Sequence, residues 1–241
     1  MRWIAVFAIL TVASAQTFPT FEVASIHPDV TGADGSVIDL PETGRLRVTN
    51  ATLKTLIRAA WGIQNDQISG GPKWLDSDRY DIEARTAGPI TEDQDQPLLQ
   101  SLLADRFHLK VYREQRELTV DALMLAKNGP LFSKIFSKST GTSSSIHTNH
   151  GPGESRIAVT GISIGQFAGM LGNRMGRIVI DKTGLSGNYD FTLVWDPDST
   201  PGSTFPSVFA ALQEQMGLRL ESQKATVPVL VIDSADHPSD N

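Results

Sequence analysis

The feature that most constrains the fold of this chain is a repeat within its own sequence. Four pairs of segments align in the same order: 45–58 with 156–169, 80–82 with 189–191, 102–111 with 211–220, and 122–125 with 229–232. Few positions are identical, but the order of apolar elements agrees throughout. Because a repeat in sequence predicts a repeat in structure, we expect an α+β fold built by internal duplication of a strand-helix-strand-strand-helix-strand-strand unit.

The spacing of apolar residues indicates where the elements of each copy lie. One apolar stripe has the period of a helix and is formed by Leu53, Leu56, Ile57, Ala60 and Trp61. It predicts a helix that stops near Gly62. Further helices are expected over 97–107, 164–172 (stopping near Gly172 or Gly176) and 206–216. Strands are expected at 46–49, 67–69, 80–84, 157–160, 178–180 and 189–195, with two more closing each copy and an extra one at 21–26.

These elements predict the organisation of the chain. An N-terminal strand and the first repeat occupy 16–127, a Ser-rich linker occupies 128–145, and the second repeat occupies 146–233. Small polar residues in the linker offer little to bury, so little order is expected there. A short polar tail covers 234–241.

The N-terminus predicts export from the cell. Basic Arg2, the apolar stretch 4–12 and the A-x-A sequence at 13–15 form a signal peptide over 1–15, cleaved near Ala15. The stretch is shorter than the roughly 20 residues that a membrane span needs, so no span is expected in the mature chain. The absence of cysteine excludes disulfides and thiolate metal sites. The net charge of −6 argues against nucleic-acid binding. We therefore expect a periplasmic or secreted protein.

Five strings resemble a known family: FEVASI at 21–26, QISGGPKWLD at 67–76, LQSLLADRF at 99–107, DKTGLSGNYDF at 181–191 and VPVLVID at 227–233. The chain is similar to an uncharacterised exported family that is expanded in soil acidobacteria and whose domain is also appended to sensor-type membrane metallopeptidases. The resemblance implies no catalytic residue. More loosely, the repeated unit resembles the short N-terminal modules of secretins and TonB-dependent receptors, which bind and assemble rather than catalyse.

Ser163 lies in a G-x-S-x-G motif at 161–165, between an expected strand and an expected helix. This is the context of a hydrolase nucleophile, for which Asp233 (or Asp181 or Asp196) could supply the acid and His237 the base. In the aligned copy, Thr52 takes the place of Ser163. Ser and Thr also cap helix N-termini, and a cap explains both copies whereas a nucleophile explains one.

Two groups of side chains could hold a metal ion. His147, His150 and Glu154 could bind Zn²⁺ and leave a position for water, but the histidines converge on one side only in a helix and the surroundings predict an exposed loop. The segment 196–200 offers oxygen ligands suited to Ca²⁺, too few for a dedicated site. A solvated turn is the alternative there.

The sequence therefore favours a non-catalytic, exported binding or assembly module of the cell envelope, with no cofactor. Its partner would be an envelope protein, a peptide or a small molecule. The alternative is a secreted hydrolase of small esters, amides or lactones, for example acyl-homoserine lactones. It would depend either on Ser163 or on a metal ion, with Zn or Ca as the candidates.

Overall fold

The computed structural model describes residues 20–31, 35–131, 136–141, 145–151, 153–197 and 203–238. The expected signal peptide at 1–15 lies outside these residues. The chain divides into two compact units. The described parts of the first unit fall within 1–60, 76–108 and 236–241, and those of the second within 61–75 and 109–235.

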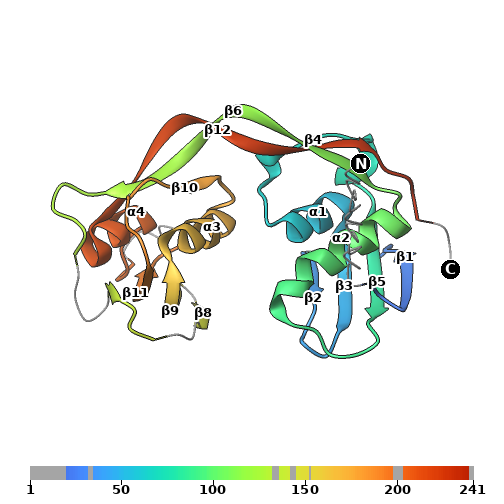
Figure 1. The fold of residues 1–241 in the computed structure, drawn as a ribbon, viewed down its shortest axis with the longest axis horizontal. Helices are drawn as coiled ribbons and strands as arrows, with labels where there is room; N and C mark the ends of the chain where they lie inside the picture. The colour runs from blue at the N-terminus through green and yellow to red at the C-terminus, as the bar shows by residue number, and fades with distance from the viewer. Residues whose placement is uncertain are drawn as a thin grey trace, which may run out of the picture. The chain divides into compact units, whose positions relative to one another are not determined.

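The first unit is a four-stranded antiparallel sheet with helices on one face (Figure 1). Its strand order is β1-β5-β3-β2, where the strands are β1 (Val23–Pro28), β2 (Val37–Asp39), β3 (Arg45–Thr52) and β5 (Arg79–Arg85). The helices are α1 (Leu53–Trp61) and α2 (Asp95–Arg106). A short 3₁₀ turn of this unit covers Glu92–Gln94, and two others, Asn65–Gln67 and Lys73–Asp76, fall wholly or mostly in the second unit.

Alternation along the strands separates the two faces of this sheet. In β3, Leu46 and Val48 are buried whereas Arg45 and Arg47 are exposed. Successive side chains of a strand point to opposite faces, so the helices cover the apolar face and the arginines occupy the other. We call this uncovered side of the sheet the open face.

The second unit contains a sheet of the same design. Its order is β7-β11-β9-β8, with β7 (Phe136–Lys138), β8 (Ser145–Gly151), β9 (Glu154–Ser163) and β11 (Asn188–Trp195). The helices are α3 (Ile164–Met175) and α4 (Val208–Ala211), the latter continued by a π-helical turn over Leu212–Met216. The apolar faces of these helices share one core with the sheet. In this core Phe167 and Phe191 pack edge to face, with ring centroids 4.7 Å apart.

A third sheet, also in the second unit, is built around two long strands. Its order is β10-β6-β12-β4, with β10 (Val179–Asp181), β6 (Lys110–Leu125), β12 (Leu218–Ser234) and β4 (Ile68–Gly70). The strands β6 and β12 run antiparallel along their whole length, whereas β4 joins β12 and β10 joins β6 in parallel. Each short strand thus pairs with the long strand of the other half of the sequence.

The predicted α+β class is confirmed, and the two halves follow the same order of elements. The strands β1, β2, β3 and β5 of one half match β7, β8, β9 and β11 of the other in sheet position. The duplication as an origin, the likeness to secretin modules and the predicted domain boundaries stay predictions.

Three details differ from the sequence-based expectation. The two strands expected to close each copy are one long strand, β6 or β12, because the antiparallel pairing runs along both, with one register shift between Ile232 and Ser234. The expected linker 128–145 holds β7, whose Phe136 is fully buried in the core. The strand at 21–26 is therefore no extra element, since β7 is its counterpart.

Candidate functional site

Ser163 caps a helix in the structure. Its side chain accepts a hydrogen bond from the backbone N–H of Gln166 at 3.2 Å, and the Gln166 side chain accepts one from the Ser163 N–H at 2.9 Å. This reciprocal arrangement satisfies two donors that the first turn of α3 would otherwise leave unpaired. Thr52 acts in the same way at α1, where it accepts a bond of 3.2 Å from the Thr55 N–H. The capping role explains both residues.

Asp233 and His237 are the other two members of the proposed triad. Asp233 is exposed on β12, and His237 belongs to the first unit whereas Ser163 belongs to the second. The His237 Nδ1 atom lies 3.0 Å from the Tyr80 hydroxyl and 3.7 Å from an Asp78 carboxylate oxygen. The catalytic assignment stays a prediction that no contact among the described residues supports.

The histidine pair lies on a strand and not on the expected loop. The backbone of β8 pairs with β9, with His147 opposite Ala158 and His150 opposite Ser155. A strand does not give the one-sided spacing on which the zinc hypothesis depends. Glu154 instead forms an ion pair with Arg156 at 3.2 Å.

Metal ligands do not gather elsewhere in the part of the chain that the structure describes, where no group of three or more His, Cys, Asp or Glu side chains could hold an ion. Of the calcium candidates, Asp196 is buried beside the Pro206 carbonyl, to which its N–H donates at 2.8 Å. The other carboxylate of that segment, Asp198, lies outside the described residues.

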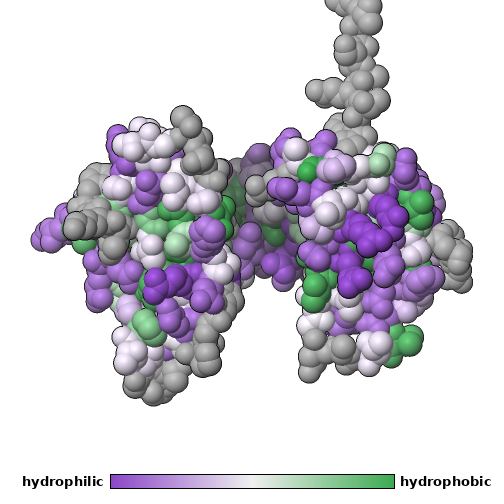
Figure 2. All heavy atoms as spheres, turned by 90° about the horizontal axis from the view of Figure 1, so that it is seen from below, coloured by the Kyte–Doolittle hydropathy of each residue, from purple (hydrophilic) through white to green (hydrophobic). Residues whose placement is uncertain are grey.

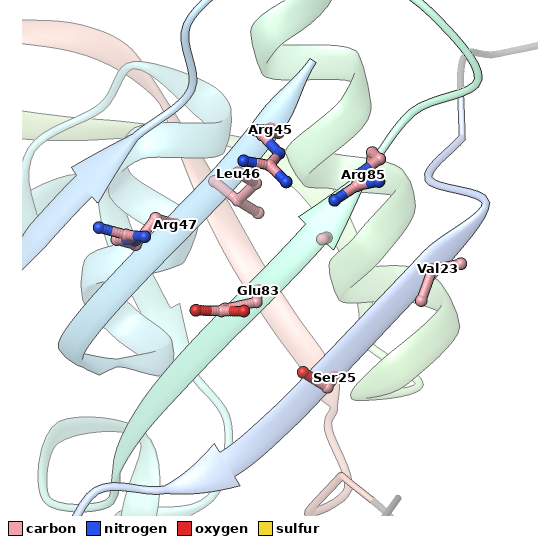
Figure 3. Close-up of a pocket in the computed structure, with 8 residues that line it drawn as sticks. Val23, Ser25, Arg45, Leu46, Arg47, Glu83 and Arg85 are labelled. Atoms are coloured by element: carbon pink, nitrogen blue, oxygen red, sulfur yellow. The ribbon is translucent and has the colours of Figure 1, made fainter. Parts of the chain in front are cut away.

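A hollow on the open face of the first unit is a candidate site (Figure 3). Its volume is about 460 Å³, which is within the usual range for small-molecule sites. The residues that line it come from β1, β3 and β5 and are Val23, Ser25, Arg45, Leu46, Arg47, Glu83, Ala84 and Arg85. We call it the arginine hollow.

Two like charges face each other in the arginine hollow. Arg45 on β3 and Arg85 on β5 are direct partners in the antiparallel register, and both are exposed. Figure 3 shows their guanidinium groups turned toward one another. Arg47 lies opposite Glu83 in the next outward-facing pair, so opposite charges meet there. The lining thus carries three positive charges and one negative in a chain whose net charge is −6.

The corresponding face of the second unit lacks this charge. The partners Arg45 and Arg85 are matched by Arg156 and Val194, and the partners Arg47 and Glu83 by Ala158 and Thr192. The remaining arginine forms the ion pair with Glu154. Both sheets therefore form with the same strand order, but the arginine pair is present in one of them.

The face of the first unit that Figure 2 shows is mostly polar. On the face that Figure 2 shows, hydrophobic residues of this unit are scattered singly among hydrophilic ones. Such scatter is ordinary for a protein surface, whereas large apolar docking sites form contiguous patches. The visible face therefore offers no broad apolar surface.

The fold and the site define a two-unit α+β protein with a charged hollow on one sheet. The sequence model of a family described as a protein of unknown function, DUF3738, matches residues 54–235, and the chain belongs to this family. Neither the curated proteins nor the solved structures gave a match. No helix among the described residues has the length and apolar character needed to cross a membrane.

The arginine hollow was not found from the sequence. Alternation of Arg45 and Arg47 with Leu46 and Val48 marks one face of a strand as charged. That Arg85 lies opposite Arg45 depends on the pairing of β3 with β5, which local sequence does not specify.

Proposed function

We infer that this chain is an exported, non-catalytic binding module of the cell envelope that holds its partner at the arginine hollow. The observation that carries the proposal is the direct pairing of Arg45 with Arg85 on the open face. Facing like charges weaken a sheet, and the corresponding sheet of the second unit forms without them. The fold therefore does not require the pair, and binding gives a reason for its presence.

The capping contacts of Ser163 support the non-catalytic part of the proposal. A hydrolase needs a nucleophile within hydrogen-bond reach of its base. The Ser163 side chain instead bonds to the backbone and the side chain of Gln166. Thr52 makes the same backbone contact at the other copy of the motif. Membership of the DUF3738 family is compatible with this proposal and adds no activity.

Export follows from the signal sequence proposed at 1–15, and the partner would be a small molecule, a peptide or an envelope protein. Localisation can be tested by fractionating cells that produce the full chain. The processed form is expected outside the cytoplasm, and a variant with Ala13 and Ala15 replaced by bulky residues should remain unprocessed. Processing of that variant at the same position would contradict the proposed cleavage site.

The binding function can be tested with the purified mature chain and a panel of small molecules and peptides that includes neutral, cationic and anionic members. We expect saturable shifts of backbone amide resonances at 23–25, 45–47 and 83–85 by NMR. The same preparation should hydrolyse no ester, amide or lactone, with or without a chelator. Turnover that is lost in Ser163→Ala, or lost on chelation, would overturn the proposal in favour of the hydrolase.

A further inference from the structure

We propose that the arginine hollow binds an oxyanion, a carboxylate or phosphate group, held between Arg45 and Arg85. The inference rests on the proposed binding function and names the chemistry of its ligand. Guanidinium groups are planar, always charged, and donate paired hydrogen bonds that match the geometry of carboxylate and phosphate oxygens. Two such groups that face each other across adjacent strands provide donors on both sides of one anion.

Electrostatics favours an anion at this position over a neutral ligand. Cross-strand partners have Cβ atoms about 5 Å apart, and like charges at this distance repel each other. Arg45 and Arg85 form no ion pair within 4 Å with any described acid, whereas several other exposed arginines of the chain do, among them Arg116 and Arg156. An anion between the two guanidinium groups would replace repulsion with two attractive contacts.

The neighbours of the pair limit the size of the charge. Arg47 is the register partner of Glu83 on the same two strands, so one positive and one negative charge offset each other there. On the other side, Val23 is the register partner of Arg85 and is 67% exposed. The hollow thus places a site of charge about +2 between a neutral pair and an exposed apolar side chain. This pattern suits a small molecule with one oxyanion group.

A nucleic acid is a poorer fit to the same charges. Its phosphates are neutralised by a row of cations along an extended surface, and the arginine hollow has three arginines with an acid among them. The net charge of −6 would repel a long polyanion. A single oxyanion group avoids both difficulties.

The test measures binding of inorganic phosphate and of succinate to the mature chain by isothermal titration calorimetry at low salt. The two probes separate phosphate recognition from carboxylate recognition. In Arg45→Gln and in Arg85→Gln the affinity for the preferred probe should fall about tenfold or more, because a charged hydrogen bond is lost. Arg85→Lys should recover part of the loss, since it keeps the charge but not the paired donors.

Arg156→Gln is the matched control, because it removes an arginine from the corresponding position of the second unit. It should leave the affinity unchanged. Binding that falls equally in Arg156→Gln, or that survives in both Arg45→Gln and Arg85→Gln, would overturn the oxyanion site. So would the absence of binding by both probes. If the hollow binds a neutral ligand, the oxyanion inference is wrong but the proposed binding function is not contradicted. Hydrolysis of a substrate would instead contradict the proposed function.

Discussion

Asn50 and Gly161 make the same backbone hydrogen bond to an aspartate in the two halves of the chain. The backbone N–H of each donates a hydrogen bond of 2.8 Å to an aspartate of the adjacent strand, Asp81 in the first half and Asp190 in the second. Both have a positive φ, 54° for Asn50 and 69° for Gly161. Each stands two residues before a helix cap, at a place where the strand register shifts. A left-handed backbone favours glycine and, next to it, asparagine, which explains the residue found at each position.

This relationship predicts the effect of removing either aspartate. Asp81→Ala and Asp190→Ala should each lower the free energy of unfolding by about 1–3 kcal/mol, because a backbone N–H loses its acceptor. Replacement by Asn should cost less, since the amide oxygen can still accept. Urea unfolding measures the loss, and amide hydrogen exchange at Asn50 and Gly161 assigns it to a position. Unchanged exchange at Gly161 in Asp190→Ala would contradict the assigned bond.

The two helix caps predict matched losses of stability. Thr52→Ala and Ser163→Ala should each destabilise the chain by about 1 kcal/mol, since each removes an acceptor from the first turn of a helix. Ser163→Thr and Thr52→Ser should be nearly neutral because the oxygen is kept. Thermal unfolding is the measurement. A Ser163→Ala variant with full stability would refute the cap.

The facing arginines should favour ligand binding but lower the stability of the ligand-free chain. Without ligand, Arg45→Gln should raise the free energy of unfolding by about 0.2–1 kcal/mol, because a repulsive cross-strand pair is removed. The gain should fade at about 1 M salt, where screening acts within roughly 3 Å. Arg47→Gln is the control: it breaks the favourable pair with Glu83 and should give no gain. A destabilised Arg45→Gln variant would show that the guanidinium groups do not repel each other.

Asp121 predicts a dependence of stability on pH. Its side chain is 3% exposed, and one carboxylate oxygen accepts a hydrogen bond of 2.8 Å from Arg177. Burial raises the pKa of Asp121 above its ordinary value of 3.8, and the positive charge of Arg177 opposes that rise. The folded chain therefore binds the proton more tightly than the unfolded chain does. The contribution of Asp121 to stability is fully present below pH 3.8 and is lost as the pH rises through the raised value.

Asp121→Asn tests this sign. The stability of the variant should not fall as the pH rises from 3.8 through the raised pKa of Asp121. The variant should keep a hydrogen bond to Arg177 through its amide oxygen. Urea unfolding of both chains over a series of mildly acidic pH values gives the comparison. A variant whose stability changes with pH in parallel with the parent would exclude Asp121 as the source.

Regular elements with strong local patterns could be predicted from the sequence. The stripe from Leu53 to Trp61 gave α1 with its bounds, and Gly62 follows it with a φ of 61°. The strands around Tyr80 and Tyr189 were also predicted, since their alternation of buried and exposed residues is regular. In these segments the local pattern and the tertiary packing favour the same conformation.

Elements that depend on distant partners could not be predicted. The strand β7 has three residues in a Ser-rich segment, and its order comes from pairing with β11 and from burial of Phe136. His147 lies in a strand because β8 pairs with β9, although its own neighbours are polar. The arginine hollow depends on the register between β3 and β5 in the same way. Local sequence does not specify these pairings.

The crossed pairing of the third sheet has a consequence for how the chain is made. The short strand β4 is synthesised early, yet its partner is the far end of β12, the last strand of all. Until that end emerges, the first residues of β6, 110–113, also lack their antiparallel neighbours, and an unpaired strand edge is a surface through which chains associate. A premature stop shortly before residue 230 would thus leave a strand from the first third of the chain without its place in a sheet.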